Sequence, residues 1–129
     1  RKTHMSHTIL IIEDSPDNMM IVSMILQSMG YNTIEATNGV MGLEMVKTHQ
    51  PDVVLMDYHL PGINGLDATK TIKTSKNLCH IPVIALTADI YTKEDFLQAG
   101  CDAYLAKPIR KGSLLRTVQQ VLNAVAVQS

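Results

Sequence analysis

Acidic, hydroxyl and amine side chains stand where short apolar stretches of this 129-residue chain end. Glu13 and Asp14 follow one apolar run, and Asp57 ends another. Thr87 and Lys107 come directly after two further runs. If these runs are parallel strands of one sheet, their carboxyl ends meet at one edge, and three carboxylates, a hydroxyl and an ammonium converge there.

Three carboxylates that lie close together raise each other's pKa values unless a cation is present. Carboxylate oxygens and water suit Mg²⁺, which prefers octahedral oxygen coordination with few protein ligands. We therefore expect Glu13, Asp14 and Asp57 to form a Mg²⁺ site, with Mn²⁺ as an alternative ion.

A carboxylate held beside a divalent cation and a lysine can accept a phosphoryl group and form an acyl phosphate, because the cations offset the incoming charge. Asp57 is the expected acceptor, since it stands alone at its strand end while Glu13 and Asp14 form a pair. The Lys107 ammonium can pair with a carboxylate or a phosphoryl oxygen. The Thr87 hydroxyl can donate one hydrogen bond to an anion.

Five apolar runs alternate with segments of helical character, which predicts an α/β domain with an open, doubly wound parallel sheet and helices on both faces. Strands are expected over residues 8–12, 31–36, 53–56, 81–86 and 103–106. Helices are expected from Pro16 to about Gly30, over 40–48, from Leu66, over 92–99 and at the end of the chain. In the last helix the expected inward positions are Leu115, Val118, Leu122 and Val125.

The amino-acid composition argues against several classes of function. With 46% apolar residues, 18% charged residues and a net charge of −1, the chain is expected to be a soluble, cytoplasmic globular domain. It has no basic run for nucleic acid and no apolar run long enough for membrane insertion. Cys79 and Cys101 lack metal-site spacing, and we expect both to be small core or semi-buried residues.

Four motifs in order resemble the receiver domain of two-component response regulators. They are Ile-Ile-Glu-Asp (11–14), Leu-Met-Asp-Tyr-His-Leu-Pro-Gly-Ile-Asn-Gly (55–65), Ala-Leu-Thr-Ala (85–88) and Tyr-Leu-Ala-Lys-Pro-Ile (104–109). The resemblance implies a CheY-like, flavodoxin-like (βα)5 three-layer sandwich with strand order 2-1-3-4-5. It predicts one receiver domain over residues 8–127, with residues 1–7 a disordered or extraneous start.

The resemblance also implies roles for single residues. Asp57 is the expected phosphorylated aspartate, with Glu13, Asp14, Asp57 and the backbone carbonyl of His59 as Mg²⁺ ligands. The residues expected to bind the phosphoryl group and switch are Thr87, Ala88, Tyr104 and Lys107, with a cis bond before Pro108. His59 and Asp89 occupy positions that tune the phosphate lifetime in this family.

The expected partners follow from the same resemblance. The donor is a histidine kinase or a histidine phosphotransfer protein, and an unknown output protein binds the face of the fourth helix, fifth strand and fifth helix. The protein would act as a monomer or a weak phosphorylation-dependent dimer. It would be a signalling domain that takes part only in its own phosphotransfer and autodephosphorylation, and not otherwise an enzyme.

Two methionines of the first helix indicate where the phosphodonor binds this domain. At 100° per residue, Val22, Ile25, Leu26 and Met29 form the inward face, which leaves Met20 and Met24 outward. Adaptable methionine side chains suit a partner surface. We expect Met20 and Met24 to contact the donor's helical bundle, with extra burial inside the domain as the alternative.

The sequence was also compared with what other classes of function require. A degenerate receiver could act as a constitutive protein-binding module. An aspartyl-phosphate phosphatase would use the same acceptor chemistry, but that family has a second aspartate where this chain has His59. A flavin carrier would meet repulsion from Glu13 and Asp14, and the GxxxxGK[ST] phosphate loop of nucleotide hydrolases is absent.

Overall fold

The structure, a computed structural model, describes residues 7–88 and 93–128. Five strands alternate with five helices along this part of the chain. The strands are β1 (Thr8–Ile12), β2 (Asn32–Ala36), β3 (Val53–Asp57), β4 (Val83–Thr87) and β5 (Ala103–Ala106). The helices are α1 (Pro16–Ser28), α2 (Gly39–His49), α3 (Gly65–Thr74), α4 (Lys93–Ala99) and α5 (Lys111–Gln128). The prediction for the first six residues lies outside the described ranges.

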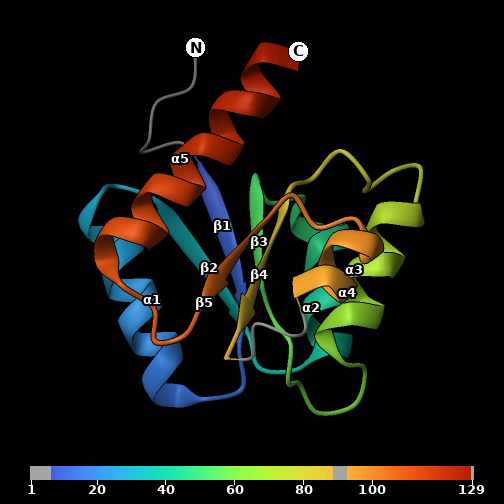
Figure 1. Ribbon diagram of the computed structural model, residues 1–129, viewed down its shortest axis with the longest axis horizontal. Helices are drawn as coiled ribbons and strands as arrows, with labels where there is room; N and C mark the ends of the chain where they lie inside the picture. Colours follow the sequence, from blue (N-terminus) through green and yellow to red (C-terminus); the bar gives the residue numbers. More distant parts are fainter. Residues whose placement is uncertain (1–6, 89–92, 129) are drawn as a thin grey trace.

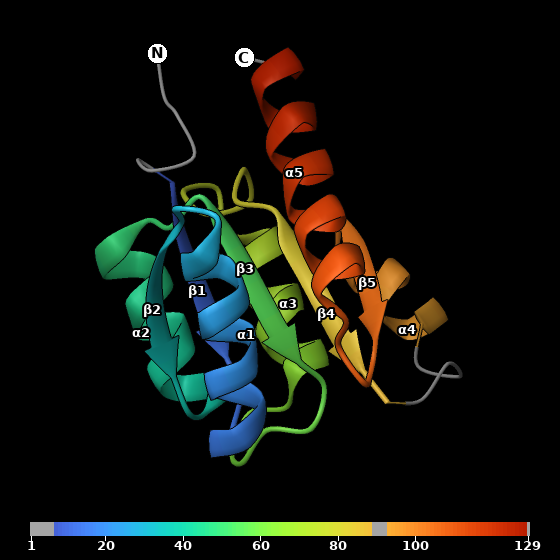
Figure 2. The same cartoon turned by 90° about the vertical axis from the view of Figure 1, so that its left-hand side faces the viewer.

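All four strand pairings are parallel, and the sheet order is β2-β1-β3-β4-β5. Helices α1 and α5 cover one face of the sheet, and α2, α3 and α4 cover the other (Figures 1 and 2). The predicted three-layer fold is therefore confirmed, with β2 as an edge strand. Because the strand order reverses between β1 and β3, the carboxyl ends of these two strands flank the switch point where such folds bind ligands.

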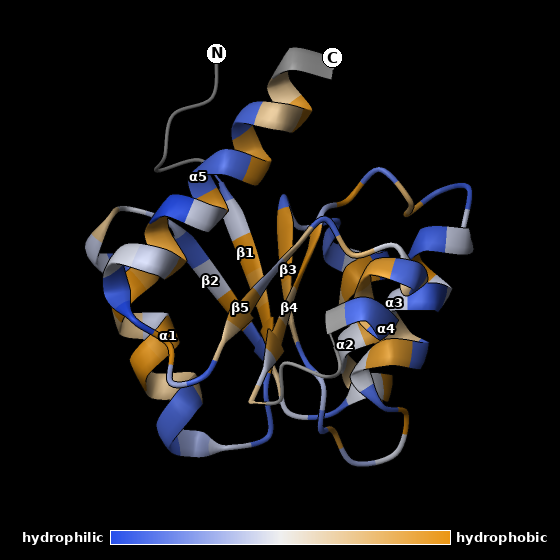
Figure 3. Ribbon diagram, in the orientation of Figure 1, coloured by the Kyte–Doolittle hydropathy of each residue, from blue (hydrophilic) through white to orange (hydrophobic). Residues whose placement is uncertain are grey.

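Alternate residues of each central strand serve two separate cores. Leu10 and Ile12 of β1 belong to the core under α2, α3 and α4. Ile9 and Ile11 belong to the core under α1 and α5. Strands β3 and β4 are buried at every residue, as expected for parallel strands covered on both faces (Figure 3). Both central strands are thus fixed from above and below, which gives their carboxyl ends firm positions.

Local capping sets where the first three helices begin. Ser15, Asn38 and Asn64 each accept a hydrogen bond from the backbone N–H three residues later. These side chains satisfy amide groups that the first helical turn leaves unpaired. After α1 the chain reverses at Gly30, whose φ of 88° lies in the left-handed region that favours glycine.

The predicted inward face of α1 is only partly correct. Val22 and Leu26 are buried and Ile25 is partly buried. Met29, however, is 45% exposed, because it is the C-cap residue and its backbone (φ −102°, ψ 10°) has left the helical phase. Met19, which the sequence reading did not place inward, is 7% exposed.

The inward face of α5 also differs from the prediction. Val118 is buried as expected, but its buried neighbours are Leu114 and Val121. Val125 is 38% exposed because the last turns of α5 run past the end of the sheet (Figure 1). The predicted Leu115 and Leu122 are partly buried against the same core, so α5 packs on the sheet as far as Leu122.

The two cysteines occupy different environments. Cys101 is buried, and burial with the neighbouring Asp102 charge raises the pKa of its thiol to about 11. Cys79 is exposed in the loop between α3 and β4, so the expectation that it is a core or semi-buried residue is wrong. Both are free thiols.

Candidate functional site

The residues predicted to do chemistry meet at the carboxyl edge of the sheet. Glu13 and Asp14 follow β1, Asp57 ends β3 and Thr87 ends β4. Lys107 follows β5. Since the strands are parallel, these side chains come from four neighbouring strand ends on one side of the molecule, the lower side in Figure 1.

The three carboxylates form a compact cluster. One oxygen each from Glu13, Asp14 and Asp57 lies within 4.8 Å of the other two. Glu13 and Asp57 are buried, whereas Asp14 is exposed at the mouth of the cluster. Glu13 Oε1 is buried, and the contact given for it is the ion pair with Lys107 Nζ at 3.2 Å, with no well-formed hydrogen bond. A hard divalent cation such as Mg²⁺ fits this set, because it offers the buried oxygen a ligand bond and leaves a solvent side for water.

Lys107 supplies the positive charge of the site. Its Nζ lies 2.7 Å from Asp57 Oδ1 and 3.2 Å from Glu13 Oε1. The backbone N–H of Lys107 donates to the carbonyl of Thr87 at 2.8 Å, which ties the start of this loop to β4. The predicted cis bond between Lys107 and Pro108 is present. The ammonium therefore bridges the carboxylates of Asp57 and Glu13.

Burial and charge shift the pKa values of two of these groups. Burial, and then the Asp57 charge, raises the pKa of Glu13, although the Ser15 N–H and Lys107 partly oppose the shift. Burial alone would lower the pKa of Lys107, but its hydrogen bond to Asp57 and the charges of both carboxylates outweigh burial and raise it. Lys107 is thus held fully protonated, and the ionised form of Glu13 is disfavoured until a cation joins the cluster.

Thr87 and Tyr104 lie on adjacent strands. The Thr87 residue is buried at 2% exposure, and β4 pairs with β5 so that Ala85 is opposite Tyr104. Tyr104 is 39% exposed, so its ring reaches the surface. Ala88 follows Thr87 and is exposed. This placement is compatible with the predicted switch, in which the ring moves inward, but that movement stays a prediction.

His59 lies at the rim. It is exposed, and its ring contacts Tyr58 edge to face at a centroid distance of 4.8 Å. Its backbone carbonyl as a metal ligand stays a prediction, and so does its influence on phosphate lifetime. Asp89, the other residue assigned to lifetime, lies outside the described residues.

Two residues shape the site in ways that the sequence reading missed. A Cβ at Gly65 would collide with the carbonyl oxygen of Asp57, so the turn after β3 requires glycine there. The Ser15 N–H donates to Glu13 Oε2 at 3.2 Å and so orients that carboxylate.

A doubly wound parallel sheet with an acidic cluster and a lysine at its carboxyl edge is the arrangement expected of a receiver domain. A family model described as the response regulator receiver domain matches residues 9–119. The polar-differentiation response regulator DivK of Brucella anthropi is 38% identical over 121 residues, covering 92% of this chain and 98% of DivK.

Solved structures of related proteins have the same fold. The receiver domain of sensor histidine kinase PA1611 from Pseudomonas aeruginosa, with a magnesium ion coordinated in its active site cleft, has a TM-score of 0.85 and 34% identity, covering 91% of this chain and 98% of that one. The chemotaxis response regulator CheY4 of Vibrio cholerae has a TM-score of 0.84 and 26% identity, covering 89% and 98%.

The chain belongs to the response regulator receiver domains of two-component signalling. The resemblance inferred from the four motifs is therefore confirmed. Receiver domains take phosphoryl groups from histidine kinases or phosphotransfer proteins. Within the described residues, no helix combines the length and apolar character needed to cross a membrane.

Replacing Glu13 with glutamine should stabilise the metal-free protein at neutral pH by about 1 kcal/mol, because a buried charge next to Asp57 is removed. The folded-state pKa of Glu13 is raised, so the unfolded chain loses this proton first as pH increases, and wild-type stability falls across that interval. The advantage of Glu13→Gln should therefore disappear in acid, where both states carry a protonated glutamate.

Urea unfolding of both proteins across this pH range, with and without Mg²⁺, checks this expectation. Mg²⁺ should stabilise the wild type more than Glu13→Gln. A variant that is less stable than the wild type at neutral pH without Mg²⁺ would contradict the argument.

Proposed function

We propose that this receiver domain is a phosphorylation-dependent switch that accepts a phosphoryl group on Asp57 from a phosphohistidine donor. The observation that supports it most directly is the 2.7 Å contact of Lys107 Nζ with the buried Asp57 carboxylate, beside the acidic pair. In a solvated loop such a carboxylate would be an ordinary surface acid. Here it has a counter-charge, a candidate cation site and an opening to solvent at Asp14.

In the proposed reaction an Asp57 carboxylate oxygen attacks phosphorus as the bond from phosphorus to the donor's histidine nitrogen breaks, leaving an acyl phosphate and a free imidazole. Glu13, Asp14 and Asp57, with the backbone carbonyl of His59, would hold Mg²⁺, which when bound would offset the charge of the phosphoryl oxygens. Lys107 exchanges part of its contact with Asp57 for a phosphoryl oxygen. Thr87, at the next strand end, donates its hydroxyl to another phosphoryl oxygen.

Phosphorylation brings roughly −1.5 to −2 charges into the site at pH 7, by analogy with other phosphorylated side chains. We propose that Thr87 and Lys107 rearrange around these charges and that Tyr104 moves into the space left by the Thr87 hydroxyl. The changed surface is that of α4, β5 and α5, where an output partner binds. A phosphatase acting on small molecules is less well supported. That family has an aspartate as general acid two residues after the acceptor, and this chain has His59 there.

Incubation with acetyl phosphate and Mg²⁺, followed by intact-mass analysis, tests the acceptor. The wild type should gain one phosphoryl group only with Mg²⁺, and Asp57→Asn should gain none while keeping the far-ultraviolet circular dichroism of the wild type. No gain by folded wild-type protein would instead favour a degenerate receiver that binds partners constitutively. Unchanged labelling of Asp57→Asn would place the acceptor elsewhere.

Substitution of Thr87 by alanine tests the switch. Thr87→Ala should still be labelled by acetyl phosphate, but the phosphorylation-induced change should weaken by about tenfold in population, since one hydrogen bond to the phosphoryl group is lost. Amide hydrogen exchange in β5 and α5, measured with and without acetyl phosphate, reports the change. A full wild-type response in Thr87→Ala would contradict this role.

The outward methionines of α1 test donor docking. Met20→Lys with Met24→Lys should slow transfer from a phosphorylated histidine phosphotransfer protein roughly tenfold, because apolar contact area is lost. Labelling by acetyl phosphate should not change. The matched control is Val40→Lys with Met41→Lys, which adds the same charge on α2, against the opposite face of the sheet. Equal transfer rates for both double variants would contradict docking on α1.

A further inference from the structure

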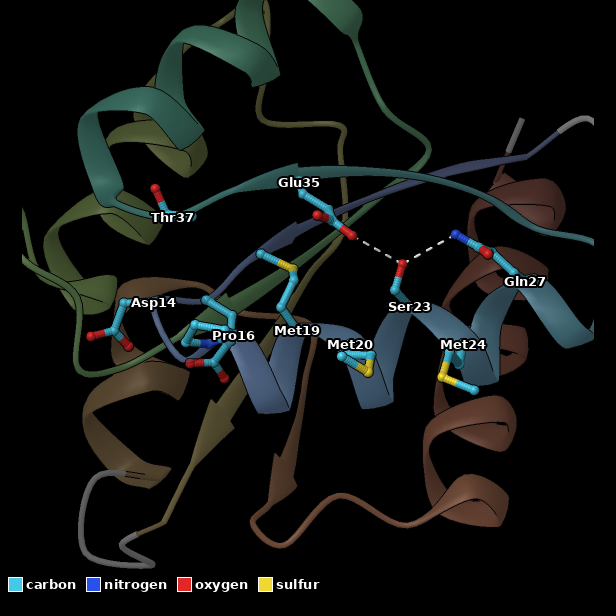
Figure 4. A pocket seen from close by; sticks show the side chains of 10 residues that line it. Asp14, Pro16, Met19, Met20, Ser23, Met24, Gln27, Glu35 and Thr37 are labelled. Carbon is cyan, nitrogen blue, oxygen red and sulfur yellow. Dashed lines mark hydrogen bonds between the residues drawn. The ribbon is translucent and has the colours of Figure 1, made fainter.

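An open groove of about 400 Å³ lies between α1 and the edge strand β2, beside the acidic cluster. Figure 4 shows its walls, with methionines of α1 along one side and Glu35 of β2 along the other. The groove is lined by Glu13, Asp14, Pro16, Met19, Met20, Ser23, Met24, Gln27, Glu35 and Thr37. Only its first two residues belong to the site described above.

One wall of the groove is apolar and adaptable. Met20 and Met24 are 59% and 63% exposed, which confirms their predicted outward orientation. They are one helical turn apart, so their side chains lie on the same flank of α1. Met19 is buried beneath them. Flexible thioether side chains of this kind pack around an incoming apolar group of irregular shape.

The opposite wall carries an oriented carboxylate. Glu35 Oε2 accepts a hydrogen bond of 3.1 Å from the Ser23 hydroxyl, and Ser23 Oγ in turn accepts one of 3.2 Å from Gln27 Nε2 (Figure 4). Glu35 is exposed, and among the described residues no ion pair joins it to a basic side chain. The carboxylate is therefore held in place and faces the groove with its charge uncompensated.

The whole lining has one sign of charge. Three of the ten lining residues are acidic, and none is lysine, arginine or histidine. Lys107 balances part of the charge of Glu13 and Asp57, but it lies on the β5 side of the cluster and contacts neither Glu35 nor Asp14 at ion-pair distance. A ligand that matches the groove must combine a thin apolar stem with a cationic end.

We infer that the groove receives an arginine side chain of the phosphodonor, with its stem against Met20 and Met24 and its guanidinium on Glu35. Arginine has a long apolar stem, and its planar fork of donors pairs with carboxylates in a charge-assisted way. It is also enriched at protein interfaces, where lysine is depleted. The inference rests on the proposed function only for the identity of the partner. It makes Glu35, on the edge strand, a specificity determinant of the docking surface.

The test uses n-butylguanidinium as the probe and protein labelled with ¹³C at the methionine methyl groups, at saturating Mg²⁺. The methyl signals of Met20 and Met24 should shift saturably. In Glu35→Gln the binding should weaken by about threefold to tenfold, as expected for one charge-assisted hydrogen bond at a partly exposed site. Glutamine still offers an oxygen to Ser23, so the wall stays intact. The matched control is Glu44→Gln, which removes an exposed acid on α2 and should bind like the wild type.

Two results would overturn the inference. One is equal affinity of Glu35→Gln and wild type for n-butylguanidinium. The other is an equal shift of the same methyl signals by n-pentanol, which would show an apolar groove without selection for a cation. Acetyl phosphate labelling of the same samples is independent of the groove. If labelling fails while the probe binds, the groove is still a site for a cationic side chain. The assignment of that side chain to a phosphodonor would then be wrong.

Discussion

Repulsion among three carboxylates at one sheet edge is the constraint around which this domain is built. Glu13 and Asp57 are buried, so water screens their charges poorly, and Lys107 is the cation that the described structure brings within ion-pair distance. One ammonium cannot balance the cluster, and burial together with the Asp57 charge raises the pKa of Glu13. The metal-free site is thus incomplete in charge. In the proposed function, a divalent cation and then a phosphoryl group would change that balance in opposite directions, and this would be the physical basis of the switch.

The fold maintains this unfavourable cluster because the strands that carry it are held by packing rather than by the site. β3 and β4 are buried at every residue, and alternate side chains of β1 enter two different cores. These apolar runs are also why the sequence predicted the strands well. Continuous apolar segments that end in a charged or hydroxyl residue leave little ambiguity between a buried strand and a loop. The expected helix starts at Pro16, residue 40 and Leu66 lie within one residue of the observed starts, where Ser15, Asn38 and Asn64 cap the helices with their side chains.

Other features depend on the detailed path of the backbone in three dimensions, and the sequence did not predict them. The requirement for glycine at position 65 comes from the approach of its backbone to the Asp57 carbonyl, and no residue-type pattern encodes that approach. The errors at Met29 and Val125 share one cause. A helical wheel assumes a full-length helix on a full-length sheet, whereas α1 has left its helical phase at Met29 and α5 outruns the sheet at Val125. The residue types of the site and the strand ends that carry them were predictable, whereas the close approach at Gly65 and the packing at the helix ends were not.

The position of Lys107 also makes the distribution of charge around the site asymmetric. Because its ammonium approaches from β5, the charges of Glu13 and Asp57 are balanced on that side, while exposed Asp14 and Glu35 extend the negative charge towards the open flank of β2. Fields of one sign in a partly enclosed groove attract counter-charges and guide an approaching partner. A cationic group drawn to this flank contacts Met20 and Met24 next to Asp14, at the mouth of the cluster. Glu35 is not part of the carboxylate cluster, so its charge stays on this flank when a cation occupies the cluster, and it favours the approach of a basic partner there.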